Sequence, residues 1–121
     1  MDRTLLKALA LGVAMVAATP LYAMEAISDR STFMDALDGR ELRIGLYGLS
    51  LKVTDDGRIA GSALGRTVTG DWSWQDGYFC REIMWGDREI PYNCQLVEAQ
   101  SDKMRFTTDR GAGDSASFSL R

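Results

Sequence analysis

The sequence predicts a mainly β fold, a small antiparallel meander that closes into a roughly eight-stranded barrel, with one short N-terminal helix. Three observations predict it. Apolar and polar residues alternate over many short runs, turn signals such as Asp-Gly separate these runs, and a single helical pattern precedes them. The chain of 121 residues has room for one domain. We expect a signal peptide at 1–23 and a single β-barrel-like domain at 24–121.

Residues 1–23 have the pattern of a secretory signal peptide. Arg3 and Lys7 supply the positive start, and Ala23 is a small residue at the expected cleavage position. The apolar run between them has about 11 residues, and a membrane-spanning helix needs roughly 20. An uncleaved membrane anchor is the alternative. We therefore expect a periplasmic or secreted protein with no stable membrane anchor after cleavage.

Composition and charge exclude several classes of function. The chain has 14 Lys+Arg against 17 Asp+Glu, a net charge of −3, and it has no histidine. An acidic balance provides no basic surface for nucleic acid, so no nucleic-acid partner is expected. Without histidine, a His-based catalytic triad and a His-ligated zinc site are both impossible. We therefore expect a non-catalytic protein with no cofactor and no metal.

The helical pattern lies at 31–39. Ser31 is a candidate N-cap, and Gly39 suits the C-terminal end of a helix. Between them, Phe33, Met34 and Leu37 form an apolar stripe at helical spacing. This short helix is expected to lay its stripe on the sheet.

The rest of the chain has the pattern of strands and turns. An open meander leaves unpaired edges, and closure into a barrel removes them. A barrel of about eight strands has an interior that is filled by side chains or just large enough for one small ligand. The expected strands are 41–47, 49–53, 58–63, 66–75, 77–84, 92–98, 103–109 and 115–121.

Cys80 and Cys94 are the only cysteines. In an exported protein an even pair predicts a disulfide. A hairpin centred on Asp87 would set the two cysteines directly opposite each other, at the separation that a disulfide needs. A bond that closes a loop of about 15 residues stabilises a fold by about 3 kcal/mol. Because no C-x-x-C pattern is present, we expect a structural disulfide and not a redox-active pair.

Three aromatic residues are candidates for a contact site. Trp72 and Trp74 share one face of their strand because side chains alternate with a period of two. With Tyr78 across the turn at 76–77, they could form the floor of an apolar pocket or a contact patch. Ordinary core packing is the alternative.

Arg81 and Trp85 are the other candidate ligand or partner contacts. If Arg81 faces the barrel interior, it needs a carboxylate partner and marks a binding site for an anionic group. The alternative is a solvated position in a cross-strand series of charges. Trp85 lies beside Gly86 at the tip of the cysteine hairpin, where an exposed tryptophan would suit partner binding. Its alternative is a side chain folded back over the barrel mouth.

Several motifs follow one another along the chain: Leu37-x-Gly39-Arg40, Asp56-Gly57, Gly70-x-Trp72-x-Trp74, Asp76-Gly77-x-x-Cys80 and the later Cys94. This order resembles small exported proteobacterial proteins of unknown function. The resemblance covers most of residues 33–98, and some of those relatives carry the label dihydrodipicolinate reductase. A dinucleotide site needs a Gly-rich loop before a helix, whereas Gly57, Gly61 and Gly65 lie among expected strands. The sequence therefore does not support the reductase label.

Three functional hypotheses follow. The first is an exported non-catalytic binding module for a small apolar molecule, a peptide or an envelope component. The second is a periplasmic inhibitor or protein-interaction factor that contacts an envelope protein through the disulfide-braced Trp85 loop. The third is an enzyme such as the reductase named for some relatives. An interior cavity would favour the first hypothesis, and a packed interior with an exposed Trp85 would favour the second.

Overall fold

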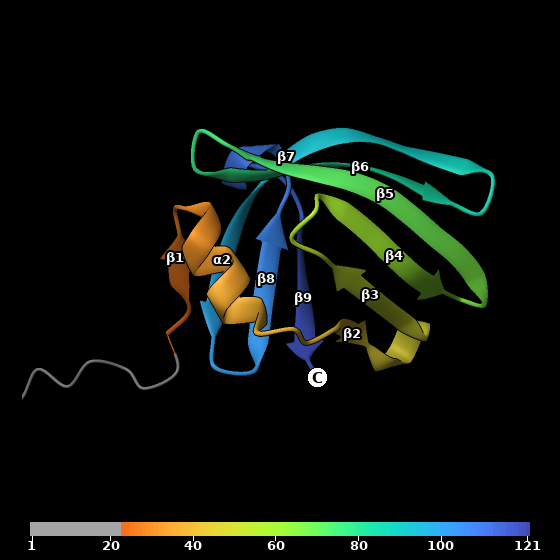
Figure 1. Cartoon of the computed structure of the whole chain (residues 1–121), viewed down its shortest axis with the longest axis horizontal. Helices are drawn as coiled ribbons and strands as arrows, with labels where there is room; N and C mark the ends of the chain where they lie inside the picture. The colour runs from red at the N-terminus through yellow and green to blue at the C-terminus, as the bar shows by residue number, and fades with distance from the viewer. Residues whose placement is uncertain (1–22) are drawn as a thin grey trace, which may run out of the picture.

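Eight strands form a closed antiparallel barrel, as the sequence predicts. The computed structural model describes residues 23–121, so the predicted signal peptide lies outside the described residues apart from Ala23. Neighbouring barrel strands follow chain order, and the last strand pairs with the first (Figure 1). The barrel strands are β2 (Leu42–Ile44), β3 (Leu49–Val53), β4 (Arg58–Ala63), β5 (Arg66–Gln75), β6 (Tyr78–Trp85), β7 (Arg88–Gln100), β8 (Lys103–Thr107) and β9 (Ser115–Leu120).

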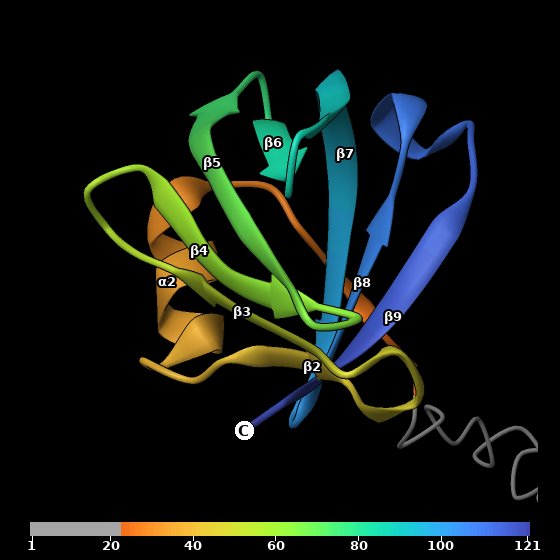
Figure 2. The same ribbon diagram turned by 90° about the vertical axis from the view of Figure 1, so that its right-hand side faces the viewer.

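Two N-terminal elements add to the barrel. β1 (Glu25–Ile27) pairs with the second half of β7, beyond the part of β7 that pairs with β6. α2 (Arg30–Leu37) packs against one end of the barrel (Figure 2). Its fully buried Phe33 lies 5.4 Å from Trp72 and 6.3 Å from Phe106, measured between ring centroids. The helix therefore closes this end of the barrel.

The start of α2 differs from the sequence prediction. The N-cap is Asp29, whose carboxylate accepts hydrogen bonds from the Thr32 backbone N–H at 3.2 Å and from the Ser31 hydroxyl at 2.8 Å. The prediction of Ser31 as the cap is wrong because a longer acidic side chain already satisfies the first free N–H groups. Asp38 and Gly39, both left-handed, end the helix. No helix among residues 23–121 is long and apolar enough to cross a membrane.

The hairpin of β6 and β7 carries the predicted disulfide. Cys80 and Cys94 are paired in register and bonded to each other. The hairpin turn is the two residues 86–87, which alone would place the cysteines one position out of register. A β-bulge between the cysteines and the turn adds one residue to β7, at 91–92, and restores the alignment. Pro91 is tolerated in this bulge because its backbone nitrogen does not have to donate a hydrogen bond to the neighbouring strand.

The end of the barrel opposite α2 is surrounded by loops, and we call it the mouth. η1 (Gly45–Tyr47) lies here, so the strand expected at 41–47 stops early as β2. The turns at 64–65 and 86–87 and the loop through η2 (Asp109–Gly111) complete the mouth. The loops at the mouth belong to segments far apart in the chain.

Two glycines on the inner face explain part of the barrel's shape. Gly61 lies opposite Leu51, and Gly70 lies between Val68 and Trp72 on β5. A Cβ atom on Gly61 would collide with the backbone of the neighbouring strand β3, and one on Gly70 would collide with that of β6. The two glycines therefore permit the close approach of neighbouring strands in the barrel wall.

Candidate functional site

The barrel interior is hollow towards the mouth. An inner chamber of about 300 Å³ adjoins a rim chamber of about 260 Å³. Both are lined by Leu49, Leu51, Ile83 and Ile90, so the chambers meet at these four side chains. Ligand pockets in proteins span about 300–1,000 Å³, so the inner chamber lies at the lower end of this range and the rim chamber extends it. The interior is therefore not fully packed.

The wall of the inner chamber is mostly apolar and includes a few polar residues. Its residues come from every barrel strand except β5. Concave apolar walls with few polar groups are typical of small-molecule sites. The polar members are Arg81, Gln95, Thr108, Asp114 and Ser115. The apolar members are Leu42, Leu49, Leu51, Val53, Ile59, Phe79, Ile83, Ile90, Phe106, Ala116 and Phe118.

The rim chamber opens between exposed apolar side chains. Tyr47 is 51% exposed and Leu64 is 62% exposed, and both line the chamber. The Leu64 backbone N–H donates to the Tyr47 carbonyl at 3.0 Å, which joins the two loops. Leu46, beside Tyr47, is 85% exposed. Neighbouring apolar side chains are therefore exposed at the opening of the rim chamber.

Leu64 occupies a backbone conformation that leucine rarely adopts. Leu64 and Gly65 are the two turn residues between β4 and β5, with φ of +51° and +76°. Positive φ at both positions defines the primed hairpin turn, in which Asn-Gly and Asp-Gly are favoured. A leucine here costs stability and adds apolar surface at the mouth. Such local strain is often found at functional sites.

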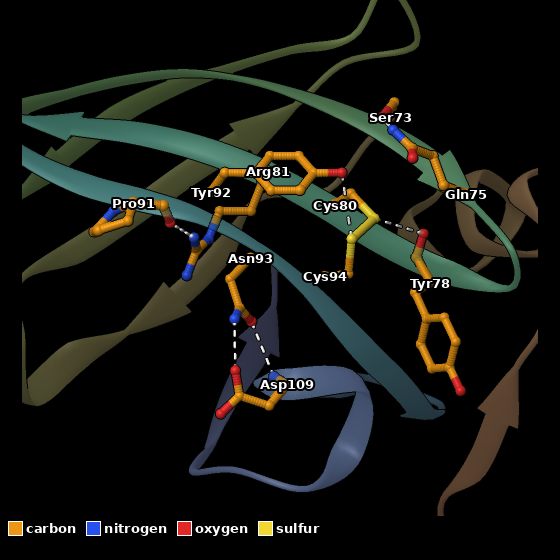
Figure 3. The surroundings of a disulfide bond; sticks show 10 residues. All are labelled: Ser73, Gln75, Tyr78, Cys80, Arg81, Pro91, Tyr92, Asn93, Cys94 and Asp109. Atoms are coloured by element: carbon orange, nitrogen blue, oxygen red, sulfur yellow. Dashed lines mark hydrogen bonds between the residues drawn. A yellow bond between two sulfur atoms is a disulfide. The ribbon is translucent and has the colours of Figure 1, made fainter.

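Arg81 faces the barrel interior and lines the inner chamber. Its Nη1 donates to the Pro91 carbonyl at 2.8 Å, within the β-bulge (Figure 3). No carboxylate of residues 23–121 lies within ion-pair distance of its guanidinium. Burial lowers the pKa of the Arg81 guanidinium from its ordinary value, but an arginine remains charged. The chamber therefore contains a cation without a counter-ion from the described chain.

Gln95 is a second polar group in the inner chamber, and sequence reasoning missed it. The residue is 7% exposed, and its side-chain amide has no hydrogen-bond partner among residues 23–121. Every fully enclosed side-chain N or O atom in this range has a partner, so the Gln95 amide atoms must be accessible from the chamber. One signal could have found it: Gln95 follows Cys94, and neighbouring residues of a strand face opposite sides.

Two aspartates lie on the loop between β8 and β9. Asp114 lines the inner chamber at the mouth and is exposed. Asp109 is held by Asn93, whose amide nitrogen donates to the Asp109 carboxylate at 2.8 Å (Figure 3). The Asp109 backbone N–H donates back to the Asn93 side chain at 3.0 Å. Neither carboxylate forms an ion pair with Arg81.

Trp72 and Trp74 line neither chamber. Trp72 is 6% exposed, and its indole N–H donates to the Thr54 carbonyl at 2.9 Å. The indole N–H of Trp74 donates to the Ser28 carbonyl at 3.1 Å. Both rings pack against Phe33 of α2. They belong to the closed end of the barrel, where the core-packing alternative describes them.

Tyr78 lies on the opposite face from the two tryptophans. The two-residue turn pairs Gln75 with Tyr78 and Trp74 with Phe79. Tyr78 therefore points outward, where the Arg110 guanidinium lies 5.2 Å from its ring centroid. The expectation that Tyr78 shares a face with Trp72 and Trp74 is wrong. Phe79 takes that place and lines the inner chamber.

Trp85 is folded back over the mouth. Its indole N–H donates to the Ala63 carbonyl at 2.8 Å, and the Arg66 guanidinium lies 5.0 Å from its ring centroid. The side chain is half-buried and lines the rim chamber. An interior cavity is therefore present, and Trp85 is a wall of it and not a projecting contact residue.

The fold and its chambers define a class, a disulfide-braced antiparallel β-barrel with an internal apolar cavity. Comparisons with protein-family models, with curated proteins and with solved structures find no match to this chain. Within residues 23–121, no three His, Cys, Asp or Glu side chains gather closely enough to hold a metal ion. The function must therefore be argued from the site itself.

Proposed function

We propose that the protein is a non-catalytic binding module for a small, largely apolar molecule held inside the barrel. The observation that carries this proposal is the inner chamber of about 300 Å³ with its apolar wall. Its two polar inner-face groups, Arg81 and Gln95, are too few to solvate a polar ligand, but they are enough to orient an apolar one. The rim chamber extends the same space towards solvent.

We place this activity in the periplasm or outside the cell. A Cys80–Cys94 disulfide persists in an oxidising compartment and is rare in the cytoplasm. The signal-peptide pattern of residues 1–23 supports the same location. A small apolar molecule or an envelope component is accordingly the expected ligand class.

An inhibitor or interaction factor that acts through Trp85 is less well supported. Its indole N–H is already bonded to Ala63, and its ring lies under Arg66. Contact with a partner through this ring would first have to break these interactions. The geometry therefore favours the cavity over the hairpin tip as the binding site.

The test fills the junction between the two chambers. Ile83 lines both chambers, and the next residue on β6, Met84, is exposed on the outer face. Ile83→Trp and Met84→Trp therefore make the same addition on opposite faces of one strand. The probe is N-phenyl-1-naphthylamine, a neutral apolar dye whose fluorescence rises in an apolar site.

Wild type and Met84→Trp should bind the dye, and Ile83→Trp should bind it about tenfold or more weakly. Urea unfolding of each variant establishes that it is folded before binding is compared. Equal dye affinity in folded Ile83→Trp and Met84→Trp, or no dye binding by wild type, would overturn the proposal.

A further inference from the structure

We infer that the ligand is a single-chain carboxylic acid, whose carboxylate is bound by Arg81 and Gln95 and whose apolar chain fills the chambers. This inference rests on the proposed function and narrows its ligand class. It depends on two polar groups that the protein buries in an apolar chamber and leaves without full partners.

The first group is the Arg81 guanidinium. It has five N–H donors, and one hydrogen bond to the protein is formed, to the Pro91 carbonyl at 2.8 Å. A half-buried cation without a counter-ion is unfavourable, and an anionic ligand would supply that counter-ion. The planar donor fork of arginine matches the two oxygens of a carboxylate.

The second group is the Gln95 amide, which is more than nine-tenths buried. Arg81 pairs with Asn93, and Gln95 pairs with Phe79, so Arg81 and Gln95 are diagonal neighbours on the inner face. Diagonal neighbours lie about 7–8 Å apart, close enough for two long side chains to reach one bound group. The Gln95 amide can donate to one carboxylate oxygen while Arg81 binds the other.

The charges around Arg81 favour a ligand with one negative charge. Asp114 lines the same chamber, Asp109 is held by Asn93, and Glu82 lies on the outer face of β6. Arg81 is the one cation among the described residues that line this chamber, so it can pair with one negative charge of a ligand. A phosphate, with up to two negative charges, would meet repulsion from Asp114 without a second cation in the chamber.

The chamber walls determine the rest of the ligand. The space beyond Arg81 is bounded by Ile83, Ile90 and Leu51, and it leads to the rim at Tyr47 and Leu64. The inner chamber of about 300 Å³ is at the lower end of the range for ligand pockets, and the rim chamber adds about 260 Å³, which suits one acyl chain.

The test compares ligands that differ only in the head group. Decanoate, decanol and decyl phosphate are each titrated against protein loaded with N-phenyl-1-naphthylamine, at neutral pH. Wild type should bind decanoate about tenfold or more tightly than decanol. Arg81→Met removes the cation and keeps an unbranched apolar side chain, so in this variant the ratio of decanoate affinity to decanol affinity should fall to about one.

Arg88→Met is the matched control. Arg88 lies on the same hairpin, is exposed and lines neither chamber. Its replacement changes the net charge of the protein by the same amount as Arg81→Met. This control should retain the preference for decanoate. Urea unfolding establishes that Arg81→Met is folded.

The outcomes separate this inference from the proposed function. If wild type does not bind the dye, the proposed function fails. If it binds the dye but takes decanoate and decanol equally, or if Arg81→Met keeps the preference, only the carboxylate assignment fails. Tighter binding of decyl phosphate than of decanoate would also overturn that assignment.

Discussion

Replacing Leu64 by asparagine should stabilise the fold and weaken ligand binding. The turn residues Leu64 and Gly65 both have positive φ, and Asn-Gly is the favoured pair in such a turn. A left-handed residue with a bulky side chain costs roughly 1–2 kcal/mol, and asparagine avoids much of this cost. Because Leu64 is 62% exposed, little burial is lost. We expect the free energy of unfolding to rise by about 1 kcal/mol.

Two measurements on the same samples test this prediction. Thermal unfolding should show an increase of about 4–8 °C in the midpoint of the variant. Affinity for N-phenyl-1-naphthylamine should fall because Leu64 lines the rim chamber. If a ligand covers on the order of 30 Å² of this side chain, at about 25 cal/mol per Å², the loss is about threefold.

Leu64→Ala separates the two effects. Alanine removes the same apolar contact but keeps the unfavourable backbone conformation, so dye binding should fall without a gain in stability. An asparagine variant less stable than wild type would refute the conformational reasoning. Unchanged dye affinity in both variants would refute the assignment of the rim chamber to the site.

Two further predictions concern stability. The double variant Cys80→Ala/Cys94→Ala should lower the free energy of unfolding, measured in urea, by about 3 kcal/mol. Reduced wild type should be as unstable as this variant. A variant as stable as oxidised wild type would contradict the stabilising role of the disulfide. The pKa of Glu41 lies below its ordinary value of 4.5 because the Ser50 hydroxyl donates to its carboxylate and the Arg43 cation is near. Its folded-state pKa is depressed, so the carboxylate stabilises the fold above about pH 4.5 and this contribution is lost as the pH falls through the lowered value. Glu41→Gln should therefore be less stable than wild type at neutral pH, and this difference in the free energy of unfolding should disappear in acid. A difference that does not depend on pH, measured by urea unfolding, would refute this reasoning.

Local signals explain why much of the fold could be predicted. The Asp76-Gly77 turn has the residue types that a two-residue hairpin prefers, and the spacing of Cys80 and Cys94 predicts their pairing. The pairing of β2 with β9 has no such local signal because it joins distant parts of the chain. Barrel closure was expected from the need to remove open edges and not from any residue pattern.

The site was less predictable because alternation assigns a residue to a face but not to a depth along the barrel. Trp72 and Ile83 both face inward, yet Trp72 packs under α2 and Ile83 lines the chambers. Counting the turn as two residues would have placed Phe79, not Tyr78, beside Trp74. For Arg81 the sequence left an inward and a solvated position open, and the structure shows that the residue lines the inner chamber.

The disulfide lies back to back with the proposed carboxylate site. Cys80 precedes Arg81 and Cys94 precedes Gln95, so one covalent crosslink on the outer face holds both donor-bearing positions on the inner face. Moving the Arg81 guanidinium away from the Gln95 amide would require deforming the disulfide-bonded pair of strands. The site is therefore held rigid in the absence of ligand, and less entropy is lost on binding. Before the disulfide forms, Arg81 and Gln95 would be held less rigidly. Affinity for the ligand should therefore increase when the two cysteines are oxidised.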